Sequence, residues 1–433
     1  MVKILFQKEK FFKKKFKDLL CKREDSDQSI DKVVNKIINN VKKKSDVALI
    51  SYTKKFDRFN VLNVNDLIVS KKEIDNGLAQ VEKKTINSLK RAIERVRSYH
   101  KRQIPKNDLY RDNHNVLLGG IWNPIDSVGL YVPGGAASYP SSLIMNAIPA
   151  IVAGVERIVI TVPAMNGRIN PLVLACAKIL GIKEIFKIGG AQAIAALAYG
   201  TKTIKSVDKI VGPGNAYVAS AKKKVFGKVG IDMIAGPSEI LVLADRKNNP
   251  DHIAIDLLSQ AEHDELAQSI LITDNEKFAK DTILSVDKFL KVLDRKKIAR
   301  KSWDNYGAVI VTKDLKNVSE LINEIAPEHL ELAIDNADKM LKKIKNAGAV
   351  FLGRNTPEAI GDYIAGPNHV LPTSGSARFS SGLSVNDFLK RQSLIKITKT
   401  GIERLGSSVI NLAKHENLDG HANSVKMRLK KEN

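Results

Sequence analysis

The spacing of apolar residues divides the chain into a helical first part and a longer part in which strands and helices alternate. Over residues 29–110, apolar positions recur three or four residues apart, as in VVNKIINNV and INSLKRAIERV, and this period predicts amphipathic helices. From about residue 126, short runs rich in β-branched residues are each followed by a glycine-rich turn and an alanine-rich helical stretch. This alternation predicts a parallel sheet with crossover helices. The runs are SVGLYVP, ERIVITVP, KEIFKIGG and DKIVGPG.

A second alternating block follows the segment IDMIAGP. Its predicted strands are SEILVLAD, QSILITD, YGAVIVTK and AGAVFLG, with helical patterns between them. We therefore expect the α/β class, with two Rossmann-like doubly wound units, an N-terminal helical segment and a small C-terminal extension. The expected boundaries are a basic helical arm over 1–28, one unit over 126–238, a second, discontinuous unit over 29–125 and 239–378, and an extension over 379–433 that is too small to fold alone.

Basic residues outnumber acidic ones along the whole chain. Among 433 residues there are 70 Lys and Arg against 47 Asp and Glu, which gives a formal net charge of +23. This balance raises the hypothesis of a polyanion partner. The lysines are scattered rather than gathered in one module, so we interpret them as a solvated surface and expect no nucleic-acid partner.

The first twenty residues, MVKILFQKEKFFKKKFKDLL, place Phe12, Phe16 and Leu19 on one helical face among lysines. Membrane-surface helices and targeting peptides share some of these features. The stretch lacks the apolar core of a signal peptide and carries Glu9 and Asp18, so we predict an amphipathic arm that packs on a partner subunit. No uninterrupted apolar run reaches about 20 residues, so we expect no transmembrane helix and no membrane partner.

Cysteine is scarce in the chain, which contains only Cys21 and Cys176. Two cysteines cannot build a disulfide framework or a thiolate metal site. Cys176 lies in the apolar helical stretch PLVLACAKIL, which predicts a packed core thiol. The low count fits a reducing compartment, and we expect a cytoplasmic protein.

An acid and an imidazole stand side by side in EIAPEHLEL, residues 324–332. The ordinary interpretation of Pro327 and Glu328 is the first turn of a helix. The alternative is that Glu328 and His329 form a pair of proton-transfer groups, because a neutral imidazole titrates close to working pH. Taken alone, the stretch favours the helix start.

Three further segments carry side chains that bind divalent cations. LSQAEHDEL places Gln260 and His263 three residues apart on a predicted helix, and therefore on one face. Asp362 stands in a glycine-bounded turn, and HENLDGHANSV carries Glu416 and His421. Each has an ordinary alternative, namely a surface histidine, a turn-forming aspartate and a polar helix end. Together, Gln260, His263, Asp362 and His421 would form a nitrogen and oxygen set suited to zinc.

The loops after the predicted strands are where we expect a ligand, because open α/β sheets bind ligands at the carboxyl ends of their strands. These loops are VPGGAASYPSS, GGAQA, GPGNA and AGPSE, whose glycines allow backbone amides to approach a phosphate. No GxGxxG fingerprint follows a predicted strand, so an ordinary dinucleotide-binding fold is not supported.

From about residue 29 to the end, the chain resembles the histidinol dehydrogenase family. The motifs that carry the resemblance include GLYVPGG, GGAQAIAALAYGT, VGPGNAYV, IDMIAGPSEILV, LSQAEHDELAQS, APEHLEL and GDYIAGPNHVLPTSGSARFSSGL. The resemblance implies a zinc-dependent enzyme that oxidises L-histidinol to L-histidinaldehyde and then to L-histidine while it reduces two NAD molecules. This is the last step of histidine biosynthesis. It also implies that the unit over 126–238 contacts NAD and that the discontinuous unit holds the metal and the catalytic groups.

The resemblance further implies roles for individual residues. The family's C-terminal extension reaches into a neighbouring subunit's site, which implies a homodimer with shared active sites. The implied zinc ligands are Gln260, His263, Asp362 and His421; the catalytic pair is Glu328 and His329; the substrate pocket is Ser238, Gln260, His263, His329, Asp362, Glu416 and His421, with His369 near it; and the NAD contacts are Tyr131, Gln192 and Asn215.

Two successive oxidations at one carbon need two proton acceptors. We assign the hydroxyl proton of the alcohol to His329 and the proton of the water that adds to the aldehyde to Glu328. Zinc would act as a template, because the imidazole and amine of histidinol are good ligands. Neither cysteine is in a candidate site loop, so we expect no covalent thiohemiacetal.

Two other interpretations remain open from the sequence. One is a polyanion-binding protein on an inactive α/β scaffold, which the positive charge motivates. The other is a related zinc dehydrogenase that acts on a different amino alcohol, which the substrate loops do not exclude.

Overall fold

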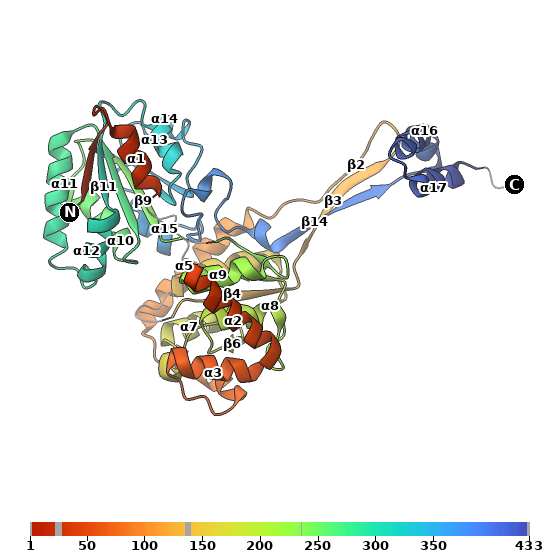
Figure 1. Cartoon of the computed structure of the whole chain (residues 1–433), viewed down its shortest axis with the longest axis horizontal. Coiled ribbons are helices and arrows are strands. Elements are labelled where there is room, and N and C mark those ends of the chain that lie inside the picture. The colour runs from red at the N-terminus through yellow and green to blue at the C-terminus, as the bar shows by residue number, and fades with distance from the viewer. Residues whose placement is uncertain (1, 22–27, 135–139, 235, 431–433) are drawn as a thin grey trace.

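Two parallel sheets and a separate antiparallel ribbon organise the chain (Figure 1). The computed structural model describes residues 2–21, 28–134, 140–234 and 236–430. The first parallel sheet has five strands in the order β6-β5-β4-β7-β8, and the second has six in the order β1-β11-β10-β9-β12-β13. The strands are β4 (Ser127–Tyr131), β5 (Arg157–Thr161), β6 (Glu184–Phe186), β7 (Lys209–Val211) and β8 (Gly230–Ile231), then β1 (Lys3–Phe6), β9 (Glu239–Ala244), β10 (Gln268–Thr273), β11 (Ala308–Val311), β12 (His329–Ala333) and β13 (Ala349–Leu352).

Both sheets are doubly wound. Consecutive strands run outward from β4 to β6 and from β9 to β11, and the chain then returns to the other side of the starting strand at β7 and at β12. All pairings within the two sheets are parallel. The α/β class with two doubly wound units is therefore confirmed.

Helices cover both faces of the first sheet, as its buried β-branched strands require. The early helices belong to this unit as well, because α2 packs on α8 and α9, while α4 packs on α7 and α5 on α6. The helices are α2 (Gln28–Lys44), α3 (Asp46–Asp57), α4 (Lys71–Ala79), α5 (Lys83–Lys101), α6 (Pro140–Ala153), α7 (Pro171–Leu180), α8 (Gly190–Tyr199) and α9 (Ala216–Val225), with short 3₁₀ turns η1 (Val64–Leu67) and η2 (Met165–Gly167).

The expected grouping of residues 29–125 with the second sheet is therefore wrong. Val34, Ile37 and Ile38 of α2 share one apolar core with Ile194 of α8 and Val218 of α9. The helical period shows that a segment has an apolar face, but it does not show which sheet that face covers.

The second sheet is also covered on both faces. Helices α10, α11 and α12 bury one apolar cluster against it, and α1, α13 and α14 bury another on the opposite face. These helices are α10 (Pro250–Ala261), α11 (Glu276–Phe289), α12 (Lys296–Tyr306), α1 (Phe12–Cys21), α13 (Ser319–Ile325) and α14 (Ala337–Leu341); α15 (Glu358–Tyr363), η3 (Ser376–Arg378) and η4 (Val385–Phe388) follow β13.

The N-terminal arm belongs to this second unit rather than to a partner subunit. Strand β1 pairs in parallel with β11, from Lys3 opposite Ala308 to Phe6 opposite Val311. The apolar face of α1 is buried in the core of the same sheet. The prediction that the arm packs on a partner is thus wrong for the described residues, because four extended residues, KILF, tie it to the sheet edge. The buried α1 residues are Phe12, Phe16 and Leu19.

A three-stranded antiparallel ribbon carries the C-terminal helices away from the two sheets (Figure 1). Most side chains of its strands β2 and β14 are exposed, including the large apolar residues Leu109, Tyr110 and Ile395. Sequence analysis missed this ribbon and expected helix and polar loop instead. Its elements are β2 (Asp108–Arg111), β3 (Leu117–Pro124) and β14 (Leu389–Lys396), followed by α16 (Lys399–His415) and α17 (Asp419–Leu429).

Within the described residues, no helix combines the length and the apolar character needed to cross a membrane.

The buried arm predicts a stability difference between two neighbouring phenylalanines. Phe16→Ala should lower the free energy of unfolding by about 3–5 kcal/mol, because it leaves a cavity under the second sheet. The matched control is Phe11→Ala, because Phe11 is 62% exposed whereas Phe16 is 3% exposed; it should change the free energy by no more than about 0.5 kcal/mol. Urea denaturation monitored by circular dichroism measures both, and equal effects would contradict the packing of the arm on its own sheet.

Candidate active site

Glu328 ends the short connection after α13 and His329 begins the central strand β12, so the pair does not stand at a helix start. Helix α13 ends at Ala326, whose φ of 48° is left-handed, and Pro327 cannot continue a helix. The chain then enters β12 at His329. Gly348 allows the neighbouring backbone to come close, since a Cβ there would lie 2.5 Å from the carbonyl oxygen of Glu328.

One residue of the adjacent strand, Glu239, orients both members of the pair. Its backbone N–H donates to Oε2 of Glu328 at 2.8 Å, and its carbonyl oxygen lies 3.0 Å from Nδ1 of His329. A carbonyl can only accept a hydrogen bond, so Nδ1 carries the proton and Nε2 carries the lone pair. The two side chains are buried, with Nδ1 of His329 3.7 Å from Oε2 of Glu328.

Burial keeps the imidazole of His329 neutral. It lowers the pKa of His329, and this outweighs the carboxylate of Asp362, which acts in the opposite direction. Nε2 has no hydrogen-bond partner among the described residues. The residue is therefore a buried, uncharged base with its free lone pair directed into the site.

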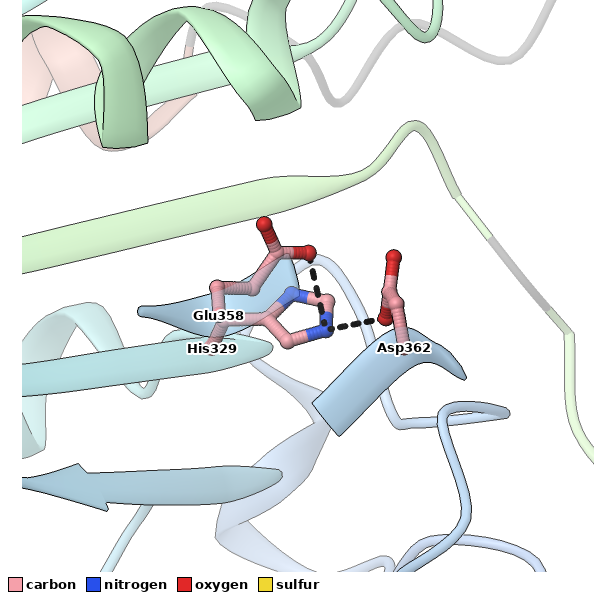
Figure 2. Close-up of side chains that lie close together, drawn as sticks. All are labelled: His329, Glu358 and Asp362. Carbon is pink, nitrogen blue, oxygen red and sulfur yellow. Dashed lines mark ion pairs between the residues drawn. The ribbon is translucent and has the colours of Figure 1, made fainter. Parts of the chain in front are cut away.

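Two carboxyl groups from α15 face that lone pair, and sequence analysis identified only one of them (Figure 2). Oε1 of Glu358 lies 3.7 Å from Nε2 of His329, and Oδ1 of Asp362 lies 3.8 Å from it. Burial and the nearby charge of Asp362 raise the pKa of Glu358 well above its ordinary value. The signal that could have revealed Glu358 is its position four residues before Asp362 in PEAIGDY, on the same helical face.

The expected metal ligands Gln260 and His263 come from the end of α10. Gln260 is fully buried, yet neither its Oε1 nor its Nε2 finds a partner in the described part of the chain. His263 stands in the turn just after the helix. Burial lowers the pKa of His263, and the carboxylate of Asp362 acts in the opposite direction, so His263 and Asp362 lie within electrostatic reach of each other. An unpartnered buried amide at the end of the helix that His263 follows fits a zinc ligand, because zinc takes nitrogen and oxygen donors.

The remaining substrate residues divide into two groups. Ser238 directly precedes β9, and His369 lies beside Asp362, with Nδ1 3.0 Å from its carbonyl oxygen. Glu416 and His421 are exposed and belong to the helices at the far end of the ribbon, away from α15 (Figure 1). The structure therefore does not bring His421 to Asp362 within one chain.

We expected the candidate site residues at the carboxyl ends of strands. In the first sheet they lie there, but in the second sheet they do not. Tyr131 ends β4, and Asn215 follows β7, which are the two strands at the switch point of the first sheet. Ser238 and Glu328, in contrast, precede β9 and β12, and so mark the amino ends of the strands at the switch point of the second.

The three expected NAD contacts lie close to the carboxyl ends of strands in the first sheet. The hydroxyl oxygen of Tyr131 accepts the N–H of Gly190 at 3.0 Å, and burial raises the pKa of Tyr131 to about 12. Gln192 is buried in α8, with no partner for Oε1 among the described groups, whereas Asn215 is exposed and caps α9 with Oδ1. Helix N-termini and an unpartnered buried amide fit a dinucleotide phosphate and ribose.

A buried ion pair fixes the loop that carries Asn215. Lys222 pairs with Asp232, and both also bind the backbone of Gly212, whose carbonyl accepts from Lys222 at 2.9 Å and whose N–H donates to Asp232 at 2.8 Å. Gly212 has a φ of 115°, and a Cβ there would lie 2.2 Å from the carbonyl oxygen of Tyr131. Only glycine therefore allows this close approach between the two loops.

Cys176 is a packed core thiol, as expected. It is fully buried in α7, and burial raises its pKa to about 12. A thiol held in this protonated state is a poor nucleophile.

Comparisons with known proteins agree with this arrangement. The family model described as histidinol dehydrogenase matches residues 20–429. A histidinol dehydrogenase of Agrobacterium fabrum is 53% identical over 421 residues, 97% of each chain, and one of Brucella suis is 52% identical over 429 residues, 99% of this chain and all of the relative. The crystal structure of histidinol dehydrogenase from Elizabethkingia anophelis superposes with a TM-score of 0.93 at 38% identity, covering 99% of this chain and 98% of that one. The chain therefore belongs to the histidinol dehydrogenase family.

Proposed function

We propose that this dehydrogenase oxidises L-histidinol to L-histidine through L-histidinaldehyde, with NAD as the hydride acceptor and a zinc ion in the site. The observation that carries the proposal is the lone pair of Nε2 of His329, which is buried, uncharged and without a partner in the described residues. Such a group is suited to remove a hydroxyl proton as hydride leaves the adjacent carbon. Family membership supports the substrate, and the polyanion-binding alternative has no support from a site of this composition.

The two proton acceptors would act on different steps. In the first oxidation, Nε2 of His329 takes the proton of the alcohol. The aldehyde has no hydroxyl proton, so water must add to its carbonyl before a second hydride can leave. The carboxylate of Glu328 would take a proton from that water while protonated His329 returns its proton to the carbonyl oxygen. The diol then forms, and His329, neutral again, would accept the proton of the diol as the second hydride leaves.

Zinc would be held by Gln260, His263 and Asp362 of one chain together with His421 of a second copy. When bound, the ion would anchor the imidazole and amine of the substrate and so fix the reacting carbon. NAD would lie against Tyr131, Gln192 and Asn215, and it supplies the hydride acceptor.

A homodimer with shared sites is supported by the ribbon. It carries Glu416 and His421 away from the chain's own site, and it exposes large apolar side chains that a second copy would cover. Exposed apolar surface of this kind marks interaction sites. The low cysteine count of the chain fits the cytoplasm as its place of action.

The division of labour predicts that Glu328→Gln slows the aldehyde step more than the alcohol step. Loss of a general base costs about 10²–10⁴-fold in rate, so oxidation of L-histidinaldehyde should fall by that factor. Single-turnover absorbance at the nicotinamide band, with L-histidinol and with L-histidinaldehyde, separates the two steps. The exposed neighbour supplies the control Glu324→Gln, and an equal loss in both steps would contradict the assignment.

The ligand set predicts that His263→Ala removes bound zinc from purified protein. The imidazole is one of two histidine ligands, and its loss leaves a single imidazole with the amide and the carboxylate, a set that holds zinc more weakly. Metal analysis after dialysis measures the effect directly, and the exposed His252 provides the control His252→Ala, which should retain its metal. Full zinc content in His263→Ala would remove this residue from the site.

Shared sites predict complementation between two inactive variants. A dimer of one Glu328→Gln chain and one His421→Ala chain contains one site with both changes and one with neither. Refolding an equal mixture should recover about a quarter of the wild-type activity, since half the dimers are mixed. Refolding each variant alone is the control, and no recovery in the mixture would count against shared sites.

A further inference from the structure

Three ligand atoms gather in the site, two of them from residues that the proposed zinc ion does not use. Nε2 of His329, a carboxylate oxygen of Glu358 and one of Asp362 all lie within 4.8 Å of one another. His329 comes from the start of β12, and the two acids come from successive turns of α15 (Figure 2). The proposed zinc ligands, in contrast, come from the end of α10 and from the ribbon of a second copy and share only Asp362 with this group.

The distances nearly match one four-coordinate ion. Ligand atoms about 2.0–2.2 Å from a zinc ion in a tetrahedron are roughly 3.3–3.6 Å apart. Nε2 of His329 lies 3.7 Å from Oε1 of Glu358 and 3.8 Å from Oδ1 of Asp362. These two distances exceed the tetrahedral range by only a few tenths of an ångström, and the two carboxylate oxygens lie within 4.8 Å of each other.

The group also lacks other partners. Nε2 of His329 and Oε1 of Glu358 are buried, and neither accepts a hydrogen bond from any described residue. Buried polar atoms without partners carry a cost that a bound ion would remove. His369 is a further imidazole beside Asp362, with Nδ1 3.6 Å from the same oxygen, but this Nδ1 also faces the carbonyl oxygen of Asp362.

We propose that His329, Glu358 and Asp362 form a second divalent-cation site, in which Asp362 bridges to the first ion and the cation inhibits the enzyme by occupying Nε2 of His329. Two ions bridged by one carboxylate lie about 3.5–4 Å apart, as in known two-metal sites. A nitrogen that coordinates a cation cannot accept a proton, so both oxidations would stop. The inference rests on the proposed function for the role of His329 and for the first ion.

The charge of the group favours a cation. Burial and the neighbouring acids Asp362, Glu331 and Glu328 raise the pKa of Glu358, which reflects several carboxyl groups in one buried volume. A divalent ion would offset this repulsion. The second ion would have three protein ligands, one of them shared, against four for the first, so it should bind more weakly and act only at excess metal.

Equilibrium dialysis against Zn²⁺, followed by metal analysis, tests the site in the intact dimer. Wild-type protein should bind a first ion per chain and then a second, weaker one. Glu358→Gln keeps the shape of the side chain but removes its charge, so it should lose the second ion, with affinity reduced by at least about 100-fold, and keep the first. Glu331→Gln, which removes an equally buried carboxyl outside the group, should bind both ions.

A second measurement links the ion to inhibition. Excess Zn²⁺ should inhibit wild type and Glu331→Gln at the concentrations at which the second ion binds, and it should not inhibit Glu358→Gln relative to that variant's own activity. A single ion per chain in wild type, or a second ion retained by Glu358→Gln, would overturn the inference. Binding of the second ion without inhibition would overturn its regulatory role. Absence of the first ion would instead count against the proposed zinc enzyme.

Discussion

The chemistry of the site depends on one peptide segment of β9 that holds two side chains of β12. Glu239 donates its N–H to Glu328 and accepts the Nδ1 proton of His329. Backbone groups of a central, fully buried strand move little, so they fix the tautomer and the direction of the imidazole more firmly than a side-chain partner would. The side chain of Glu239 also fixes the neighbouring loop, because its carboxylate accepts a hydrogen bond from the N–H of Ser374. The proposed catalytic pair, Glu328 and His329, is thus positioned by the pairing of β9 with β12, the two strands at which the second sheet changes direction.

The two sheets contribute opposite ends of their strands. The first presents helix N-termini and glycine-bounded loops after its strands, an environment that suits phosphate oxygens. The second presents the residues that precede β9 and β12 and the end of α10, an environment rich in buried acids and imidazoles. This division separates the proposed dinucleotide contacts from the proposed proton-transfer and metal-binding groups, and the low dielectric around the second set strengthens each of its interactions.

Most strands could be predicted because a buried parallel strand has a short apolar sequence rich in β-branched residues, as in SEILVLAD and QSILITD. Strand β12 was missed because its sequence, HLELA, has two polar residues that face the site and therefore breaks the apolar run. The ribbon was missed because its strands are exposed on both faces and carry no alternation that a core would impose. Of the site, residue types indicated the candidate ligands and the Glu328–His329 pair, and the resemblance to a family implied their roles. Glu358 was not predicted as a site residue because acidic residues are common in the first turn of helices.

Strand β1 ties the beginning of the chain to a partner that is synthesised much later. Lys3 pairs with Ala308, so the edge of the second sheet cannot close until both have left the ribosome. At roughly 5–20 residues per second, the first strand waits on the order of 15–60 s for its neighbour. During that interval the aromatic face of α1 has no sheet to cover, and the lysines that surround it keep the emerging segment hydrated and mutually repelled. The register of β1 with β11 thus makes the start of the chain one of the last parts of the second sheet to find its place.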